Sequence, residues 1–117
     1  LATLFPDDQG AAADAYAKGV LSYPAQMLVP HGTAVAQTGA LVGWFRGQDP
    51  AGPRITAVSV PTLVADGVVD ALDPVSNDHE LAGLIPHAQL VLYPDAGHGF
   101  LFQDAGEFVP RVDAFLR

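Results

Sequence analysis

Asp70 and His98 have the residue types and the setting expected of an acid–base pair. Each follows a short apolar run, at 61–67 and 89–93, that is typical of a buried strand. In open α/β sheets, functional loops leave the carboxyl ends of the strands, and adjacent strands lie ~4.8 Å apart. We therefore expect Asp70 and His98 to lie within hydrogen-bonding reach. An aspartate held against one imidazole nitrogen leaves the other nitrogen free to take a proton from a hydroxyl.

Other acidic residues near these strands have simpler interpretations. We expect Asp66, at the end of the first run, to cap the loop that follows, and we expect Asp95 in a turn. Asp73 precedes Pro74 and is expected in a turn or cap. Because aspartates often hydrogen-bond their own backbone in turns, Asp70 could serve only that purpose. Asp66 and Asp73 then remain its rivals for the role of the acid.

The remaining polar residues give little sign of a metal or cofactor site. Gly97 and Gly99 flank His98, which predicts a sharp turn with positive φ or a close approach of backbone. The chain has no cysteine, so disulfides, thiolate zinc sites and a cysteine nucleophile are excluded. No metal and no cofactor are predicted, because the other histidines match no spacing such as H-E-x-x-H and are expected on solvated surfaces. These histidines are His31, His79 and His87.

The second half of the chain must position the pair. Its pattern predicts a strand at 61–67, a helix at 75–85, a strand at 89–93 and an amphipathic helix at 107–116. This order is a βαβ unit with a closing helix. Parallel sheets have both faces covered, and two strands alone leave unpaired edges. We therefore expect these residues to be the edge of a larger α/β sheet, and the chain to be part of a longer gene product.

The first half predicts helices and no good strand. One helix includes the run 11–13, with Asp7 or Asp8 as its cap and an end near Pro24. A second spans 33–45, and Gly47 follows where a helix commonly ends. The third helix of the chain, at 75–85, has Ser76 or Asn77 as its expected cap. The stretch 47–53 is rich in Gly and Pro and predicts a linker. We divide the chain into a helical segment, 1–52, and an α/β segment, 53–117.

Composition excludes several classes of protein. The chain has 117 residues, half of them hydrophobic, which suits one small domain or a piece of a larger one and excludes a disordered tail. Its net charge is −8, with five basic residues, so a cationic face for nucleic acid or an anionic membrane is not expected. No apolar run reaches the ~18 residues of a membrane span, and the start lacks signal-peptide features. A cytoplasmic location is the default expectation.

Residues 55–117 resemble the C-terminal end of the α/β-hydrolase fold. The resemblance implies that Asp70 is the acid of a catalytic triad and His98 its base, 28 positions apart. By position, residues 1–54 resemble the helical lid that many members insert before the acid-bearing strand. Five features carry the resemblance in order: Val60-Pro61-Thr62-Leu63-Val64, Gly67-x-x-Asp70-x-x-x-Pro74, Ile85-Pro86-x-Ala88, Gly97-His98-Gly99-Phe100 and Phe115-Leu116.

The sequence departs from this family at the nucleophile. The G-x-S-x-G motif, which precedes the acid and the base in the family, is absent. None of the three serines, Ser22, Ser59 and Ser76, lies between glycines. The upstream oxyanion-hole loop is missing as well. Loss of the serine alone costs about 10⁶ in turnover in a known triad, so we expect the isolated chain to be nearly inert unless a partner chain completes it.

The resulting hypothesis is the C-terminal portion of a serine hydrolase acting on small ester- or amide-type substrates, without a cofactor. An N-terminal partner chain would supply the nucleophile. One alternative is a truncated, non-catalytic hydrolase that self-associates, for example as a homodimer. A receiver-type domain is disfavoured, because such folds have no histidine in the position of the 97–99 loop. The aromatic and sulfur-containing residues of the first half fit either a substrate pocket or a lid core; these are Tyr16, Tyr23, Met27, Trp44 and Phe45.

Overall fold

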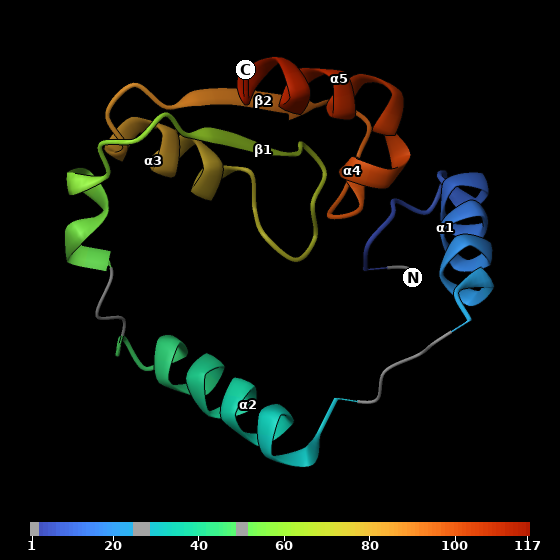
Figure 1. Ribbon diagram of the computed structural model, residues 1–117, viewed down its shortest axis with the longest axis horizontal. Coiled ribbons are helices and arrows are strands. Elements are labelled where there is room, and N and C mark those ends of the chain that lie inside the picture. The colour runs from blue at the N-terminus through green and yellow to red at the C-terminus, as the bar shows by residue number, and fades with distance from the viewer. Residues whose placement is uncertain (1–2, 25–28, 49–51) are drawn as a thin grey trace.

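A two-stranded parallel sheet with helices packed against it forms the second half of the chain, and two longer helices precede it (Figure 1). The computed structural model describes residues 3–24, 29–48 and 52–117. This mixture of helices and a small parallel sheet is consistent with a partial α/β fold. In chain order the elements are α1 (Gly10–Ser22), α2 (His31–Phe45), the 3-10 helix η1 (Gly52–Ala57), β1 (Leu63–Gly67), α3 (Ser76–Leu84), β2 (Gln89–Tyr93), α4 (Phe100–Gln103) and α5 (Ala105–Phe115).

The sheet has the predicted βαβ connection. β1 pairs with β2 in parallel, from Leu63 opposite Gln89 to Gly67 opposite Tyr93. The crossover helix α3 packs against both strands. Because side chains alternate along a strand, Val64 and Asp66 share one face of the sheet. Because β1 and β2 are parallel and end opposite each other, the loops that follow them start side by side, as the acid–base prediction requires.

The apolar core lies between β2, α4 and α5. Tyr93, Ala96 and Phe100 are buried together, and Phe108 of α5 packs against them. The rings of Tyr93 and Phe100 stack with centroids 5.4 Å apart, and Phe108 meets Phe100 edge-on at 5.2 Å. Such offset and edge-to-face contacts are favourable beyond the area that they bury. The short helix α4, which contributes Phe100, was not predicted.

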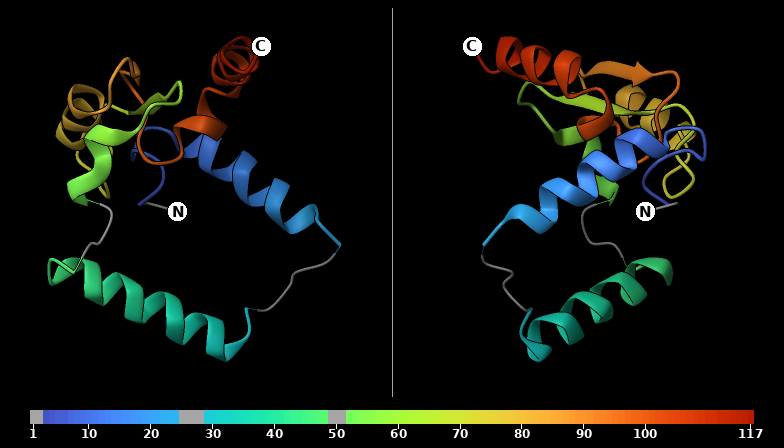
Figure 2. Two further views of the ribbon diagram at one scale, coloured as in Figure 1. Left: turned by 60° about the vertical axis from the view of Figure 1, so that its left-hand side comes forward. Right: turned by 90° about the vertical axis from the view of Figure 1, so that its right-hand side faces the viewer.

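The two helices of the first half lie outside this core. Every residue of α2 is exposed except Gly43, which is half-buried, and Figure 2 shows α2 apart from the sheet in both views. α1 reaches the second half through Tyr16, whose ring lies 4.6 Å from that of Phe102 and 5.7 Å from that of Phe5. No helix among the described residues is long and apolar enough to cross a membrane.

The predicted helices and strands are present, but the residues predicted to cap the N-termini of α1 and α3 do not do so. α1 starts after Gln9, because the preceding acidic residues lie in a turn closed by a hydrogen bond from Gln9 N to Pro6 O. Asp7 and Asp8 therefore cap nothing.

The cap of α3 is also not the predicted one. Val75 occupies the cap position, and Ser76 and Asn77 already lie within the helix. Asn77 N donates to Pro74 O, so the turn at the proline starts the helix. After α2, Gly47 adopts a φ of 74°, as a residue ending a helix often does. Part of the predicted linker, residues 49–51, lies outside the described residues.

Candidate active site

Asp70 and His98 form a hydrogen bond at the carboxyl ends of β1 and β2. Asp70 Oδ2 lies 2.7 Å from His98 Nδ1. The Asp70 side chain is completely buried, whereas 47% of the His98 side chain is exposed. Since Nδ1 is engaged by Asp70, Nε2 is the ring nitrogen available to a reacting group. The predicted contact is present. It joins a carboxylate that is shielded from solvent to an imidazole that solvent can reach.

The loop after β1 holds Asp70 in one orientation. Asp70 Oδ1 accepts hydrogen bonds from the backbone N–H groups of Leu72, at 2.6 Å, and Asp73, at 3.0 Å. Asp70 therefore stabilises its turn and contacts the histidine at the same time. Burial favours a raised pKa, but the N–H groups of Asp73 and Leu72 and the His98 ring outweigh it, so the pKa of Asp70 lies below its usual value. The lowered pKa keeps the Asp70 carboxylate ionised at neutral pH.

Backbone contacts join the acid loop to the histidine loop. Val68 N donates to Tyr93 O at 2.9 Å, and Val69 N donates to Ala96 O at 3.1 Å. Gly67 is packed so closely that a Cβ there would lie 2.1 Å from Ala96 O. Main-chain contacts therefore fix the spacing of the two loops.

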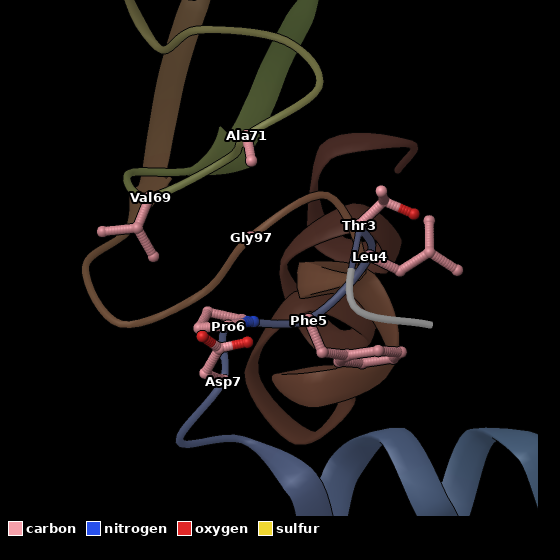
Figure 3. Close-up of a pocket in the computed structure, with 8 residues that line it drawn as sticks. All are labelled: Thr3, Leu4, Phe5, Pro6, Asp7, Val69, Ala71 and Gly97. Carbon is pink, nitrogen blue, oxygen red and sulfur yellow. The ribbon is translucent and has the colours of Figure 1, made fainter.

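The residues before α1 support the histidine loop from its other side. Gly99 N donates to Leu4 O at 2.6 Å. A Cβ on Gly99 would come within 2.8 Å of the ring of Phe5. Among the described residues Gly47 is the glycine with positive φ, so the glycines beside His98 are explained by close approach. Figure 3 shows residues 3–7 lying against this loop, around a cavity of about 230 Å³ that Val69 and Gly97 also line.

Asp66 is buried beside the pair, and its carboxyl accepts a hydrogen bond from the backbone of Gly67 at the end of β1, where the sequence predicts a loop cap. Only 5% of its surface is exposed. Burial raises its pKa to about 7, and the neighbouring carboxylates of Asp70 and Asp78 add to this rise against a hydrogen bond from the Gly67 backbone. Its position in a strand of alternating burial could have signalled that it points inward. Asp78, on α3, is equally buried and carried no such signal.

The same residues offer the geometry of a loose cation site. One ligand-type atom from each of Asp66, Asp70 and His98 lies within 4.8 Å of the others. The hydrogen bond between His98 Nδ1 and Asp70 Oδ2 joins two of these three side chains directly.

The remaining candidate residues lie away from the pair. His31, His79 and His87 are exposed, as is Asp95. Asp73 accepts a hydrogen bond from Asn77 and contacts the pair only through its backbone.

The aromatic residues of the first half line two shallow cavities. Tyr16 and Tyr23 border one of about 450 Å³ between α1 and α4. Trp44 and Phe45 border one of about 670 Å³ that reaches Leu72 in the acid loop. The positions of these four aromatic residues fit a substrate pocket as well as a lid surface. Met27, the fifth candidate, lies outside the described residues.

The fold is similar to that of a hydrolase, as a solved structure shows. The chain is similar to a thermophilic esterase from Thermogutta terrifontis, solved with malate bound. The superposition has a TM-score of 0.70, covers 98% of this chain and has 26% sequence identity. The chain spans 40% of the length of that esterase. No protein-family model and no curated protein sequence matches the chain.

Proposed function

We propose that this chain is the acid- and base-bearing portion of an α/β-hydrolase-fold serine hydrolase for ester- or amide-type substrates. The observation that carries the proposal is the 2.7 Å contact between Asp70 and His98, formed by loops that leave the same end of two parallel strands. The esterase neighbour supports the hydrolase class. Asp70 would be the acid and His98 the base.

In this proposal Asp70 keeps one proton on Nδ1 of His98. Nε2 then accepts the proton of a serine hydroxyl as that oxygen attacks the substrate carbonyl, and later donates it to the leaving group. The buried Asp70 carboxylate stabilises the imidazolium that forms in between. The half-exposed ring of His98 is accessible to a group arriving from outside the described core.

The serine would come from another segment or polypeptide, because no G-x-S-x-G occurs in the sequence. β1 is paired on one side by β2 and has an unpaired second edge within the described residues. A further parallel strand on that edge would end beside Asp70, since carboxyl ends of parallel strands meet at one edge of a sheet. We propose this edge as the place where the nucleophile-bearing part joins.

A chimera tests this proposal. The part of the Thermogutta esterase that aligns with this chain is replaced by residues 1–117, and ester hydrolysis is measured. We expect a folded chimera to hydrolyse esters, and His98→Ala to reduce kcat at least about 10³-fold. His79→Ala, an exposed histidine on α3, is the matched control and should leave the rate unchanged. A folded chimera with no activity above the His98→Ala background contradicts the proposal.

A fluorophosphonate probe tests the assignment of the serine. The chain alone should give no covalent adduct by intact mass. A stoichiometric adduct on Ser22, Ser59 or Ser76 that disappears in His98→Ala would show that this chain carries its own nucleophile. The division of the triad between two segments would then be wrong.

Exposed apolar surface supports a second candidate, a non-catalytic module that self-associates. Trp44 and Phe45 of α2 are 56% and 72% exposed, and Leu41 is 53% exposed. Together with the open edge of β1, these side chains offer a surface for a second copy. Light scattering after gel filtration would then give a stable dimer, and the chimera would show no turnover.

A further inference from the structure

Residues 4–6 lie against the histidine loop on both sides of His98 (Figure 3). Gly99 N donates a hydrogen bond to Leu4 O at 2.6 Å. A Cβ on Gly99 would lie 2.9 Å from the same oxygen, and a Cβ on Gly97 would lie 3.3 Å from it. Both neighbours of His98 are therefore packed against one carbonyl group of a segment near the other end of the chain.

The ring of Phe5 fills the space beside Gly99. Two of its carbons, Cε1 and Cζ, would lie 2.8 Å from a Cβ on Gly99. Only 3% of Phe5 is exposed, although it lies outside the core formed by β2, α4 and α5. A buried aromatic ring makes a large and rigid contact. The ring therefore restricts where the backbone after His98 can lie.

Two further rings connect Phe5 to α1 and α4. The ring of Tyr16 lies 5.7 Å from that of Phe5 and 4.6 Å from that of Phe102. Phe102 belongs to α4, which begins directly after Gly99, and Phe102 N donates to Gly99 O at 2.9 Å. Both ends of this row of three rings therefore meet Gly99. A displacement of the loop has to disturb at least one of the ring contacts.

The His98 side chain depends on its backbone for its position. Its ring is 47% exposed, so packing covers only about half of it, and Nδ1 lies 2.7 Å from Asp70. A misplacement of ~1 Å in a catalytic group can cost about 10²-fold in rate. Whatever holds Gly97 and Gly99 therefore also sets the geometry of the pair.

We propose that Phe5 is a positioning residue for His98: its ring, braced by Tyr16 of α1, holds Gly99 in place and so keeps His98 Nδ1 at Asp70. The catalytic consequence rests on the proposed function of the pair, whereas the placement of the His98 ring does not. Phe5 acts through Gly99 and touches no reacting atom. The helical segment 1–52 then contributes to the site through Phe5 and Tyr16.

Nuclear magnetic resonance on the full 117-residue chain, at one fixed pH, tests the proposal. Three-bond couplings from His98 Cγ to the backbone nitrogen and carbonyl carbon report whether the side chain occupies one χ1 rotamer or several. We expect the couplings of a single rotamer in the wild type and averaged couplings in Phe5→Ala. Phe5→Leu keeps a bulky apolar side chain and should retain most of the single-rotamer signal.

A matched control and a second pair of variants make the result specific. Ile85 is buried like Phe5 but lies before β2, whereas the histidine loop follows that strand. Ile85→Ala therefore loses stability and should leave the His98 couplings at their wild-type values. Tyr16→Ala removes the brace and should average the couplings in part, whereas Tyr16→Phe keeps the ring and should not.

Three outcomes overturn the proposal. They are averaged His98 couplings in the wild type, unchanged couplings in folded Phe5→Ala, and an equal change in folded Ile85→Ala. If Phe5→Ala fails to fold, Tyr16→Ala decides, and unchanged couplings in that variant overturn the proposal.

Turnover in the esterase chimera separates this proposal from the hydrolase function. Phe5→Ala should lower kcat at least about 10-fold and leave KM within about twofold, and Phe5→Leu should restore most of the rate. Ile85→Ala should change neither constant while the chimera is folded. An inactive chimera whose His98 couplings respond to Phe5→Ala contradicts the hydrolase function alone. An active chimera with wild-type kcat in folded Phe5→Ala contradicts the positioning role alone.

Discussion

The two halves of the chain bury their apolar side chains to very different extents. In the second half, Tyr93, Ala96 and Phe100 are almost completely covered and hold the loops of Asp70 and His98. In the first half, α1 and α2 contain no buried residue. Both halves form the helices that local sequence favours, yet α1 and α2 of the first half contribute no buried residue to the tertiary core. The difference shows that helix formation and site formation have separate causes in this molecule, and that the site depends on strand pairing and ring packing.

The largest effect should come from the contact that joins the two loops. Gly67→Ala would place a methyl group against the Ala96 carbonyl, which is main chain and cannot move aside. We expect a loss of about 4 kcal/mol in the free energy of unfolding, at the upper end of single substitutions. Gly83→Ala in α3, where nothing lies within 4 Å, is the control and should stabilise by up to about 1 kcal/mol. Urea unfolding measures both, and similar effects would contradict the close packing.

The next effect compares one aromatic residue from each half. Phe100→Ala should cost about 3 kcal/mol, because Phe100 is buried against Tyr93 and Phe108. Trp44→Ala should change stability by less than about 0.5 kcal/mol, because more than half of that side chain is exposed. Thermal unfolding by circular dichroism gives both values. A comparable loss in Trp44→Ala would mean that α2 is packed against something in solution.

A third effect depends on pH. The pKa of Asp66 is raised to about 7 in the fold, so the folded state binds more protons than the unfolded state between about pH 4 and pH 7. Stability from this group is therefore lost as pH rises through that window and is constant above it. Asp66→Asn should remove the loss and be more stable than the wild type at pH 8 by about 2 kcal/mol. Urea midpoints at pH 5 and pH 8 test this, and Asp95→Asn should parallel the wild type.

The smallest effect should come from a surface ion pair of the second half. Arg117 contacts Asp113 at 2.6 Å, and both side chains are mostly exposed. Removing the pair with Arg117→Ala should change stability by less than about 0.5 kcal/mol. A larger loss, measured by the same unfolding assay in low and high salt, would show that charge as well as burial separates the two halves.

Much of the architecture was predictable because it follows from local patterns. The strands at 63–67 and 89–93 are short apolar runs, and parallel strands bring the loops that follow them to one edge. This rule was enough to expect the hydrogen bond between Asp70 and His98. It says nothing about the catalytic roles of these residues, which remain proposals.

Other features could not be predicted because they depend on contacts between distant segments. The burial of Asp66 against α3 depends on which face the helix covers, and the packing of Phe5 on Gly99 joins residues far apart in sequence. The N-cap residues of α1 and α3 were predicted wrongly, because a turn at Pro6 and another at Pro74 shift the start of each helix by a residue or more. No sequence pattern indicates that α2 contains no buried residue.

The order in which the chain folds follows from the separation of its paired strands. Helices such as α1 involve only near neighbours and form within about a microsecond, whereas contacts between residues far apart in sequence must first close a loop. Asp70 and His98 are 28 positions apart and meet only once the α3 crossover has brought β1 against β2. The hydrogen bond between them should therefore appear in the same slow kinetic phase as strand pairing. A refolding experiment that follows the His98 resonance would report the moment at which the sheet closes.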